Sequence, residues 1–141
     1  MSIRMMETDS DILATFPVMK QLRPHLAKED YVPLIRQLQA DFGYRLIALL
    51  EEGEVAAAAG YRYCQTLASG QFLYVDDLIT DEKSRSRGFA EKLFDWLERE
   101  AAESACLSLH LDSGVQRFDA HRFYLKRKMR ISCHHFDMPL K

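Results

Sequence analysis

The sequence predicts an α/β fold in which a mixed sheet is flanked by helices. Strand-like apolar runs follow one another over residues 44–80, first as a hairpin and then as a third strand. Segments with helical spacing lie on both sides of these runs, and no linker or repeat divides the chain. With 141 residues, 48% of them hydrophobic, the chain can build one core, so we expect a single domain over residues 1–141.

The N-terminal part of the chain is expected to hold a short strand followed by a helix. The strand covers about residues 2–7. Asp9 or Ser10 can cap the following helix, because short polar side chains accept hydrogen bonds from the first backbone N–H groups. Apolar residues then recur at helical spacing as far as Leu22, and Pro24 marks the end, since a proline disfavours the α conformation of the residue before it.

A second helix and a hairpin are expected next. The helix begins at about Glu29, and Pro33 lies near its first turn, where a missing backbone N–H matters least. Gly43 then ends the helix. Residues 44–67 contain two apolar runs separated by a polar stretch around Gly53, which is the pattern of an antiparallel hairpin.

The remaining elements include one clear strand–helix–strand unit. Residues 71–80 and 105–111 read as strands, and residues 87–103 between them carry an apolar stripe at helical spacing. Such a crossover is right-handed and makes the two strands parallel. We expect a further helix over residues 115–128 and a closing strand over residues 130–138, so the order is β, α, α, β, β, β, α, β, α, β.

Composition excludes several classes of protein. The 19 basic and 21 acidic side chains give a net charge of −2, which argues against a dedicated nucleic-acid binder. Cys64, Cys106 and Cys133 form neither a CxxC motif nor a disulfide framework, which fits a reducing compartment, and the histidines have no metal-ligand spacing. No run approaches the roughly 20 apolar residues of a membrane span. We therefore expect a cytoplasmic protein with no nucleic-acid partner, no membrane association and no metal.

The stretch RSRGFA, residues 85–90, lies where the helix of residues 87–103 begins. A helix N-terminus presents unpaired N–H groups and partial positive charge, so it attracts anions. Arg85 and Arg87 add full positive charges, although the helix dipole repels them, and Gly88 allows close approach to the backbone. A diphosphate fits these features, while a simple glycine turn with solvated arginines is the alternative.

The same stretch resembles a known family. DEKSRSRGFAEKLFDWLE is similar to the coenzyme A pyrophosphate-binding motif of the GCN5-related N-acetyltransferases, the GNAT family, with the signature [Q/R]-x-x-G-x-[G/A]. Arg85, Gly88 and Ala90 occupy its three defined positions, and the preceding DDLIT resembles the family's strand. The order of elements is also the family's order. The resemblance implies a mixed, mostly antiparallel sheet with splayed central parallel strands, flanked by helices.

The resemblance also implies the co-substrate, acetyl-CoA, and the backbone that holds it. The pantetheine arm lies between the two splayed strands and pairs with the backbone of Leu78 and Thr80, as an added strand does. A backbone N–H of Leu78 or Ile79 polarises the thioester carbonyl. The pyrophosphate is held by the backbone of Arg85, Ser86, Arg87, Gly88, Phe89 and Ala90.

A second matching stretch, AHRFYLKRKM, resembles the family's A-x-x-F-Y-x-x-x-G-F helix. Ala120, Phe123 and Tyr124 match, whereas Lys128 and Met129 replace the usual glycine and phenylalanine. The tyrosine at this position commonly acts as general acid toward the coenzyme A thiolate, so the resemblance makes Tyr124 the candidate catalytic acid. The alternative is a core aromatic residue beside Phe123.

Candidates for the general base adjoin the same strand. Asp76 and Asp77 are consecutive, so strand alternation predicts that their side chains lie on opposite faces of the sheet. One of them, directly or through water, is then able to accept the proton of the attacking amine. With Asp112 and Asp119 nearby in the expected fold, these acidic side chains favour a cationic amine.

The hypothesis is an acetyl-CoA-dependent N-acetyltransferase that acts on a primary amine of a small molecule or peptide by direct attack in a ternary complex. One alternative is a non-catalytic acyl-CoA-binding sensor or interaction module on the same fold. Another is a phosphate-ligand binding domain outside this family. The strand expected at residues 130–138 also offers an edge through which a homodimer can form.

Overall fold

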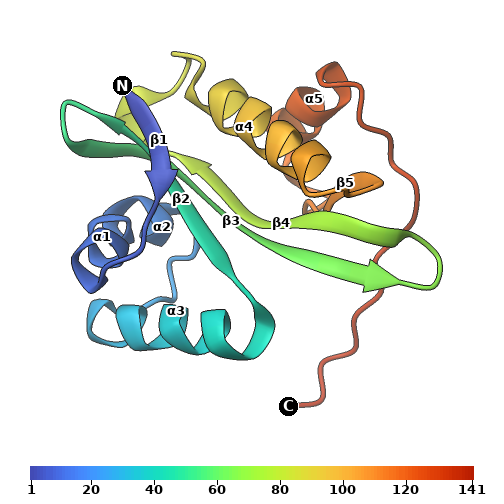
Figure 1. Cartoon of the computed structure of the whole chain (residues 1–141), viewed down its shortest axis with the longest axis horizontal. Helices are drawn as coiled ribbons and strands as arrows, with labels where there is room; N and C mark the ends of the chain where they lie inside the picture. The colour runs from blue at the N-terminus through green and yellow to red at the C-terminus, as the bar shows by residue number, and fades with distance from the viewer. The chain divides into compact units, whose positions relative to one another are not determined.

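The computed structural model describes all residues, 1–141, in two compact units (Figure 1). The first unit, Met1–His110, holds the sheet and the first four α-helices, and the second, Leu111–Lys141, holds the last helix. No helix in either unit is both long and apolar enough to cross a membrane. The single domain over residues 1–141 stays a prediction, and the two units are described separately below.

The sheet has five strands in the spatial order β1-β2-β3-β4-β5. Three neighbouring pairs are antiparallel, and β4 and β5 form the parallel pair of the expected strand–helix–strand unit, which confirms the mixed, mostly antiparallel sheet. The strands are β1 Ser2–Met5, β2 Arg45–Glu51, β3 Glu54–Thr66, β4 Gly70–Thr80 and β5 Ser108–Leu111.

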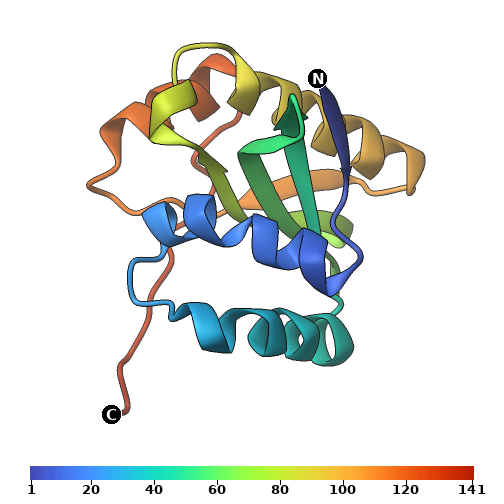
Figure 2. The ribbon, with the colours of Figure 1, turned by 90° about the vertical axis from the view of Figure 1, so that its left-hand side faces the viewer.

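Helices cover both faces of this sheet (Figure 2). The core on one face joins side chains of the N-terminal helices to alternate strand residues such as Ala58 and Ile79, and the opposite face receives Leu93 and Leu97. The central strand β3 carries small residues where both layers approach it. The helices are α1 Asp9–Ala14, α2 Phe16–Leu22, α3 Lys28–Phe42 and α4 Phe89–Glu103, with a short 3-10 helix η1 at Glu82–Ser84.

The single helix expected after residue 8 is two helices that meet at Thr15. Pro17 lies in the first turn of α2, where its missing N–H and fixed φ suit a helix start and interrupt a continuing helix. The cap of α1 is Thr8 rather than Asp9 or Ser10, and it forms a capping box with Asp11. The buried Thr15 hydroxyl donates to the Ile12 carbonyl and accepts from the Tyr31 hydroxyl at 2.7 Å.

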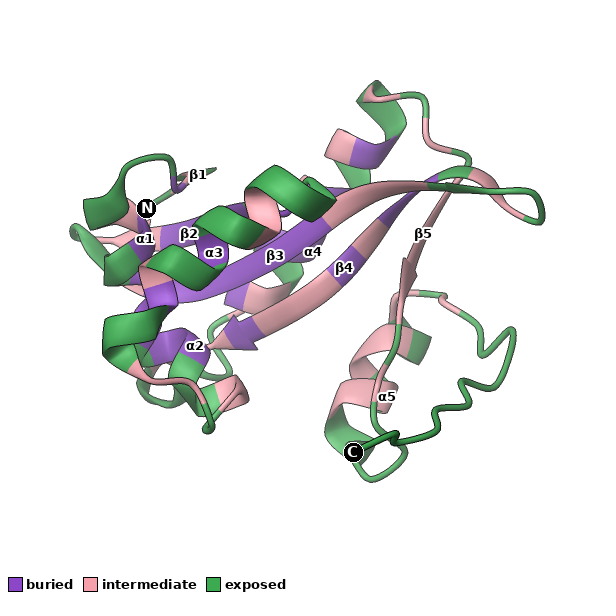
Figure 3. Cartoon of the chain, turned by 90° about the horizontal axis from the view of Figure 1, so that it is seen from below, coloured by how far each residue is buried: buried purple, intermediate pink, exposed green.

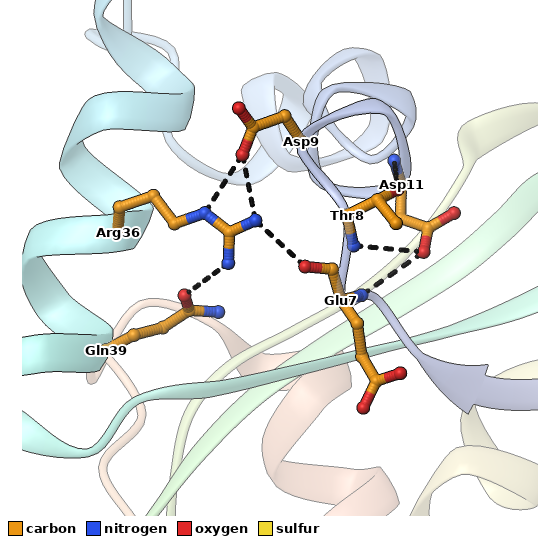
Figure 4. Close-up of polar contacts among 6 residues, drawn as sticks. All are labelled: Glu7, Thr8, Asp9, Asp11, Arg36 and Gln39. Atoms are coloured by element: carbon orange, nitrogen blue, oxygen red, sulfur yellow. Dashed lines mark hydrogen bonds and ion pairs between the residues drawn. The ribbon is translucent and has the colours of Figure 1, made fainter.

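A polar network ties α3 to the start of α1 (Figure 4). The Arg36 guanidinium donates to the Asp9 carboxylate at 2.8 and 3.0 Å, to the Glu7 carbonyl at 2.8 Å and to the Gln39 side chain at 2.9 Å. Gly43, at φ 70, ends α3 as expected. Pro33, however, lies inside α3 rather than in its first turn, because the helix begins at Lys28.

The C-terminal part of the chain differs most from expectation. Helix α5 spans Phe118–Lys126, and the strand expected over residues 130–138 is absent from the described chain. Figure 3 shows this segment as exposed irregular chain. The apolar pattern changes phase along it, because Ile131 and Cys133 fall on odd positions while Phe136 and Met138 fall on even ones. No single extended register directs all four side chains to one face.

Candidate functional site

The loop before α4 leaves the mouth of this helix uncapped. Gly88 is the N-cap residue at φ 78, and no side chain caps the first turn. A Cβ atom built on Gly88 meets no atom within 4 Å, so the space beside this residue is open. Ser86 also has a left-handed backbone, at φ 66. The glycine is therefore required by backbone conformation, and the helix mouth can receive an anion.

The two arginines of this loop have different surroundings. Arg87 makes a two-pronged ion pair with Glu51 of β2, at 2.6 and 2.8 Å, and its guanidinium lies 4.8 Å from the centre of the Phe89 ring. The helix dipole repels the positive charge of Arg87, and the carboxylate of Glu51 offsets this repulsion because it balances that charge. Arg85 is exposed and has no ion-pair partner in the described chain. Of the two arginines, only Arg85 makes no direct ion pair, although its charge helps to lower the pKa of Asp81.

Near the end of β4, two residues direct their backbone N–H and C=O groups away from β3, toward the β5 side of the strand. Asp81 N–H donates to the Ala56 carbonyl at 2.8 Å, which marks these residues as a hydrogen-bonded pair. By alternation, Ile79 is also bonded to β3, whereas Leu78 and Thr80 stand at non-bonded positions and direct their N–H and C=O groups away from β3. The N–H groups of Leu78 and Ile79 were the two candidates for polarising the thioester carbonyl. The Ile79 N–H is used by β3, so only the Leu78 N–H is available.

The same side of β4 faces its parallel neighbour. The strands are joined near the start of β4, where Leu107 N–H donates to the Gln71 carbonyl at 2.8 Å. From there they diverge, as Figure 3 shows. The splayed arrangement expected from the family resemblance is confirmed.

A β-bulge in β4 changes the arrangement of Asp76 and Asp77. Gly60 pairs with Asp77 while Tyr61 pairs with Val75, so Asp76 is an extra residue in the strand. The bulge cancels the alternation that predicted opposite faces. Both carboxylates lie on the face covered by α1–α3, as their partners show.

Each of these carboxylates has an arginine partner on that face. Arg23, at the end of α2, donates from Nε to the Asp77 carboxylate and from Nη2 to the Asp76 carbonyl, both at 3.0 Å. Arg62 of β3 binds both carboxylate oxygens of Asp76 at 2.8 and 3.0 Å. The Arg62 guanidinium also lies 5.3 Å from the centre of the Tyr74 ring. We refer to Arg23, Tyr44, Arg62, Tyr74, Asp76 and Asp77 as the bulge cluster.

Tyr44 fixes the inner end of the bulge cluster. Its hydroxyl donates to the second Asp77 oxygen at 2.8 Å, and the residue is only 5% exposed. Burial, followed by the nearby negative charge of Asp77, raises the pKa of Tyr44 well above its ordinary value, so the phenol stays a proton donor at neutral pH. Gly60 makes room for this ring, because a Cβ atom there overlaps the Tyr44 side chain.

Each acidic side chain expected to favour a cationic amine has a basic partner, and His135 balances the charge of Asp112 only when it is protonated. In addition to the two ion pairs of the bulge cluster, Asp112 lies 3.0 Å from His135 and Asp119 lies 2.6 Å from Arg122 within the second unit. Sequence reasoning missed Arg23 and Arg62, because neither belongs to a motif and their contacts with Asp77 and Asp76 depend on helix placement and strand pairing.

Tyr124 lies in the second unit, on α5. Partial burial raises its pKa above the ordinary value, with Arg117 acting in the opposite direction, so the phenol is protonated at neutral pH. Its ring makes an edge contact with Phe123 at 5.6 Å. Lys128, where the family has glycine, adopts a left-handed φ of 68, so the turn after α5 survives the replacement. His121, one turn earlier, bonds to the Gly114 carbonyl at 2.8 Å.

A mixed sheet with splayed parallel strands and an uncapped helix mouth is the arrangement that the family resemblance implies. A family model described as "Acetyltransferase (GNAT) family" matches residues 9–129, and the chain belongs to this family. That assignment removes the alternative of a phosphate-binding domain from outside the family.

One curated protein and two solved structures illustrate what this chain is similar to. The Uncharacterized N-acetyltransferase YhdJ of Bacillus subtilis (strain 168) is 33% identical over 110 residues, which are 78% of each chain. A transcriptional regulator from Bacillus halodurans C-125 has a similar fold, with a TM-score of 0.85, 21% identity and 99% of each chain covered. The aminoglycoside N-acetyltransferase AAC(6')-Iy, solved in complex with CoA, gives a TM-score of 0.79 at 15% identity, with 99% of each chain covered.

Proposed function

We propose that this chain transfers an acetyl group from acetyl-CoA to a primary amine by direct attack in a ternary complex. The observation that carries the proposal is the open, uncapped N-terminus of α4 in a chain that belongs to the GNAT family. Its first N–H groups and the exposed guanidinium of Arg85 suit a diphosphate. Arg87, paired with Glu51, orders the loop instead of meeting the anion directly.

The outward backbone of Leu78 and Thr80 supports the place proposed for the pantetheine arm. An extended amide chain can pair with these groups as an added strand does, so no particular side chain is needed. The Leu78 N–H is the proposed donor to the thioester oxygen, where negative charge develops during attack.

The reaction balances with two proton transfers. The neutral amine nitrogen attacks the thioester carbon, the C–N bond forms and the C–S bond breaks. Tyr124 is the proposed acid that gives its phenolic proton to the leaving thiolate, which its raised pKa permits because the proton is still present at neutral pH. The amine proton passes to water or to a carboxylate; Asp77 and Asp76 remain the candidate bases, and their arginine partners favour a water-mediated route.

The cofactor seat is tested by calorimetric titration of acetyl-CoA into wild type and two variants. Gly88→Ala introduces only backbone strain at φ 78, whereas Gly88→Glu adds the same strain and a negative charge at the helix mouth. We expect the glutamate variant to bind acetyl-CoA at least about ten-fold more weakly than the alanine variant, because charge repulsion of about 1.4 kcal/mol has this effect. Equal affinities of the two variants contradict the seat.

The acid is tested with Tyr124→Phe in an assay of CoA release. We expect kcat to fall by about a hundred-fold or more, with unchanged acetyl-CoA affinity, since general acid catalysis contributes about 10²–10⁴-fold. Full turnover by this variant rules out Tyr124 as the acid. The second candidate function is an acyl-CoA-binding module without catalysis on the same fold. Tight acetyl-CoA binding without CoA release across an amine panel supports that candidate.

A further inference from the structure

The acceptor side of β4 carries an unusual arrangement of charge. The bulge places the carboxylates of Asp76 and Asp77 side by side on one face, and Arg23 and Arg62 flank them. Two negative and two positive groups leave the bulge cluster with no net charge. Such a site does not favour a polycation over other amines, because each carboxylate is already compensated.

Each arginine of this cluster is fixed by only one edge of its guanidinium. Arg62 uses Nε and Nη2 on Asp76 and stacks beside Tyr74, and Arg23 uses Nε and Nη2 on Asp77 and on the Asp76 carbonyl. Nη1 of both residues has no partner in the described chain. The Arg23 and Arg62 side chains are 42% and 33% exposed, so the open edges can be reached from solvent.

A guanidinium held in this way is a ready-made clamp for a carboxylate. Its fork of donors matches two carboxylate oxygens, and its orientation is already fixed, so little side-chain freedom is lost on binding. The Asp76 and Asp77 carboxylates between the arginines keep further oxygen lone pairs, which can accept hydrogen bonds from the amine group of the same molecule. A molecule that carries an amine and a carboxylate close together therefore matches the donors and acceptors of the bulge cluster.

We propose that the acceptor is a free amino acid, bound at the bulge cluster with its carboxylate on the open edge of Arg62 or Arg23 and its amine beside Asp76 and Asp77. Tyr44, locked over Gly60, is a positioning residue that holds Asp77 in place. This inference rests on the proposed acetyl transfer for its chemistry, but the binding site itself does not depend on turnover.

The test uses amino acids and the amines that differ from them only by loss of the carboxylate. Arginine and agmatine, ornithine and putrescine, lysine and cadaverine, and tyrosine and tyramine form such pairs, and the other amino acids are screened with their amides. CoA release gives kcat/KM for each compound. We expect at least one amino acid to exceed its decarboxylated or amidated partner by ten-fold or more.

The matched variants are Arg62→Lys and Arg23→Lys. Lysine keeps the positive charge toward Asp76 or Asp77 but lacks the planar fork. We expect at least one of these variants to raise KM for the preferred amino acid about ten-fold, with kcat and acetyl-CoA affinity little changed. A purely structural role of the ion pairs instead leaves the preference between amino acid and amine unaltered.

A binding measurement separates this inference from the proposed function. Thermal unfolding is followed with each amino acid and each partner compound, with and without CoA. A rise in melting temperature with an amino acid, absent from the partner compound and reduced in Arg62→Lys or Arg23→Lys, supports the clamp even without turnover. Equal use of amines or amides, or neither turnover nor a thermal shift with any amino acid, overturns the clamp while leaving any acetyl-CoA binding intact.

Discussion

Replacement of Gly60 by alanine is expected to destabilise the protein strongly, although alanine is ordinarily the better strand residue. A Cβ atom at this position lies 2.5 Å from Cε1 of Tyr44 and overlaps its hydroxyl. Ordinary contact between carbon atoms begins at about 3.5 Å, and the hydroxyl and Cζ lie closer to the added atom than Cε1 does, so the ring has to move by more than about 1 Å. Tyr44 is 5% exposed and belongs to the core, so no free space accepts the displaced ring.

The cost has two parts. Overpacking of a filled core costs about 1–3 kcal/mol. The displaced hydroxyl also loses its 2.8 Å bond to Asp77, and a hydrogen bond to a charged group contributes about 1.5–3 kcal/mol. We therefore expect Gly60→Ala to lower the free energy of unfolding by about 3–5 kcal/mol, which corresponds to a fall of roughly 10–20 °C in melting temperature.

The assay is urea unfolding of wild type, Gly60→Ala and a matched control, Gly53→Ala. Gly53 has a φ of 81 and no atom within 4 Å of an added Cβ. Alanine there bears only left-handed backbone strain, about 1–2 kcal/mol. The steric argument requires Gly60→Ala to be the more damaging change. If Gly60→Ala lowers the free energy of unfolding by less than Gly53→Ala does, the steric reasoning is refuted. The inference that the packing of Tyr44 over Gly60 holds Asp77 in place is then refuted as well.

Two further predictions concern buried and charged groups. Tyr44→Phe removes a hydrogen-bond donor to a carboxylate and is expected to lower the free energy of unfolding in urea by about 1.5–3 kcal/mol. Tyr31→Phe removes the hydrogen bond to the Thr15 hydroxyl and is expected to lower it by about 1 kcal/mol. A larger effect of Tyr31→Phe contradicts this ranking. Hydrogen bonds from Arg4 and from the Thr8 backbone hold the pKa of Asp11 at about 2. Because this pKa is depressed on folding, its stabilising contribution is present above about pH 4 and is lost as pH falls toward 2. The free energy of unfolding of wild type should therefore fall more steeply over that interval than that of Asp11→Asn, and parallel curves argue against the shift.

Local signals in the sequence predicted most of the elements and the cofactor side of the site. The hairpin, the glycine at the end of α3 and the strand–helix–strand unit follow from periodicity and turn residues that act over a few positions. Gly88 and its neighbours were recognisable for the same reason. Pro17 was a local signal for the break at Thr15. The prediction missed it because the apolar residues on both sides continue at helical spacing.

Other features depend on residues far apart in the chain. Residues 130–138 do not form the expected strand. A strand needs a neighbouring strand to pair with, and apolar periodicity does not show whether one is present. The bulge at Asp76 is a mismatch between two strands, and a single strand's alternation carries no trace of it. Its consequence is large, because it brings both carboxylates to one face.

The sequence by itself determined most of the elements, the family and the glycine-containing loop at the mouth of α4, since each depends on a contiguous stretch of residues whose chemistry is local. Only the tertiary structure decided which charges meet beside β4. Arg23 and Arg62 come from a helix end and a neighbouring strand, and Tyr44 reaches Asp77 across the sheet because Gly60 leaves it room. Strand pairing and core packing, which join distant segments, are the physical reason that the acceptor side could be read only in three dimensions.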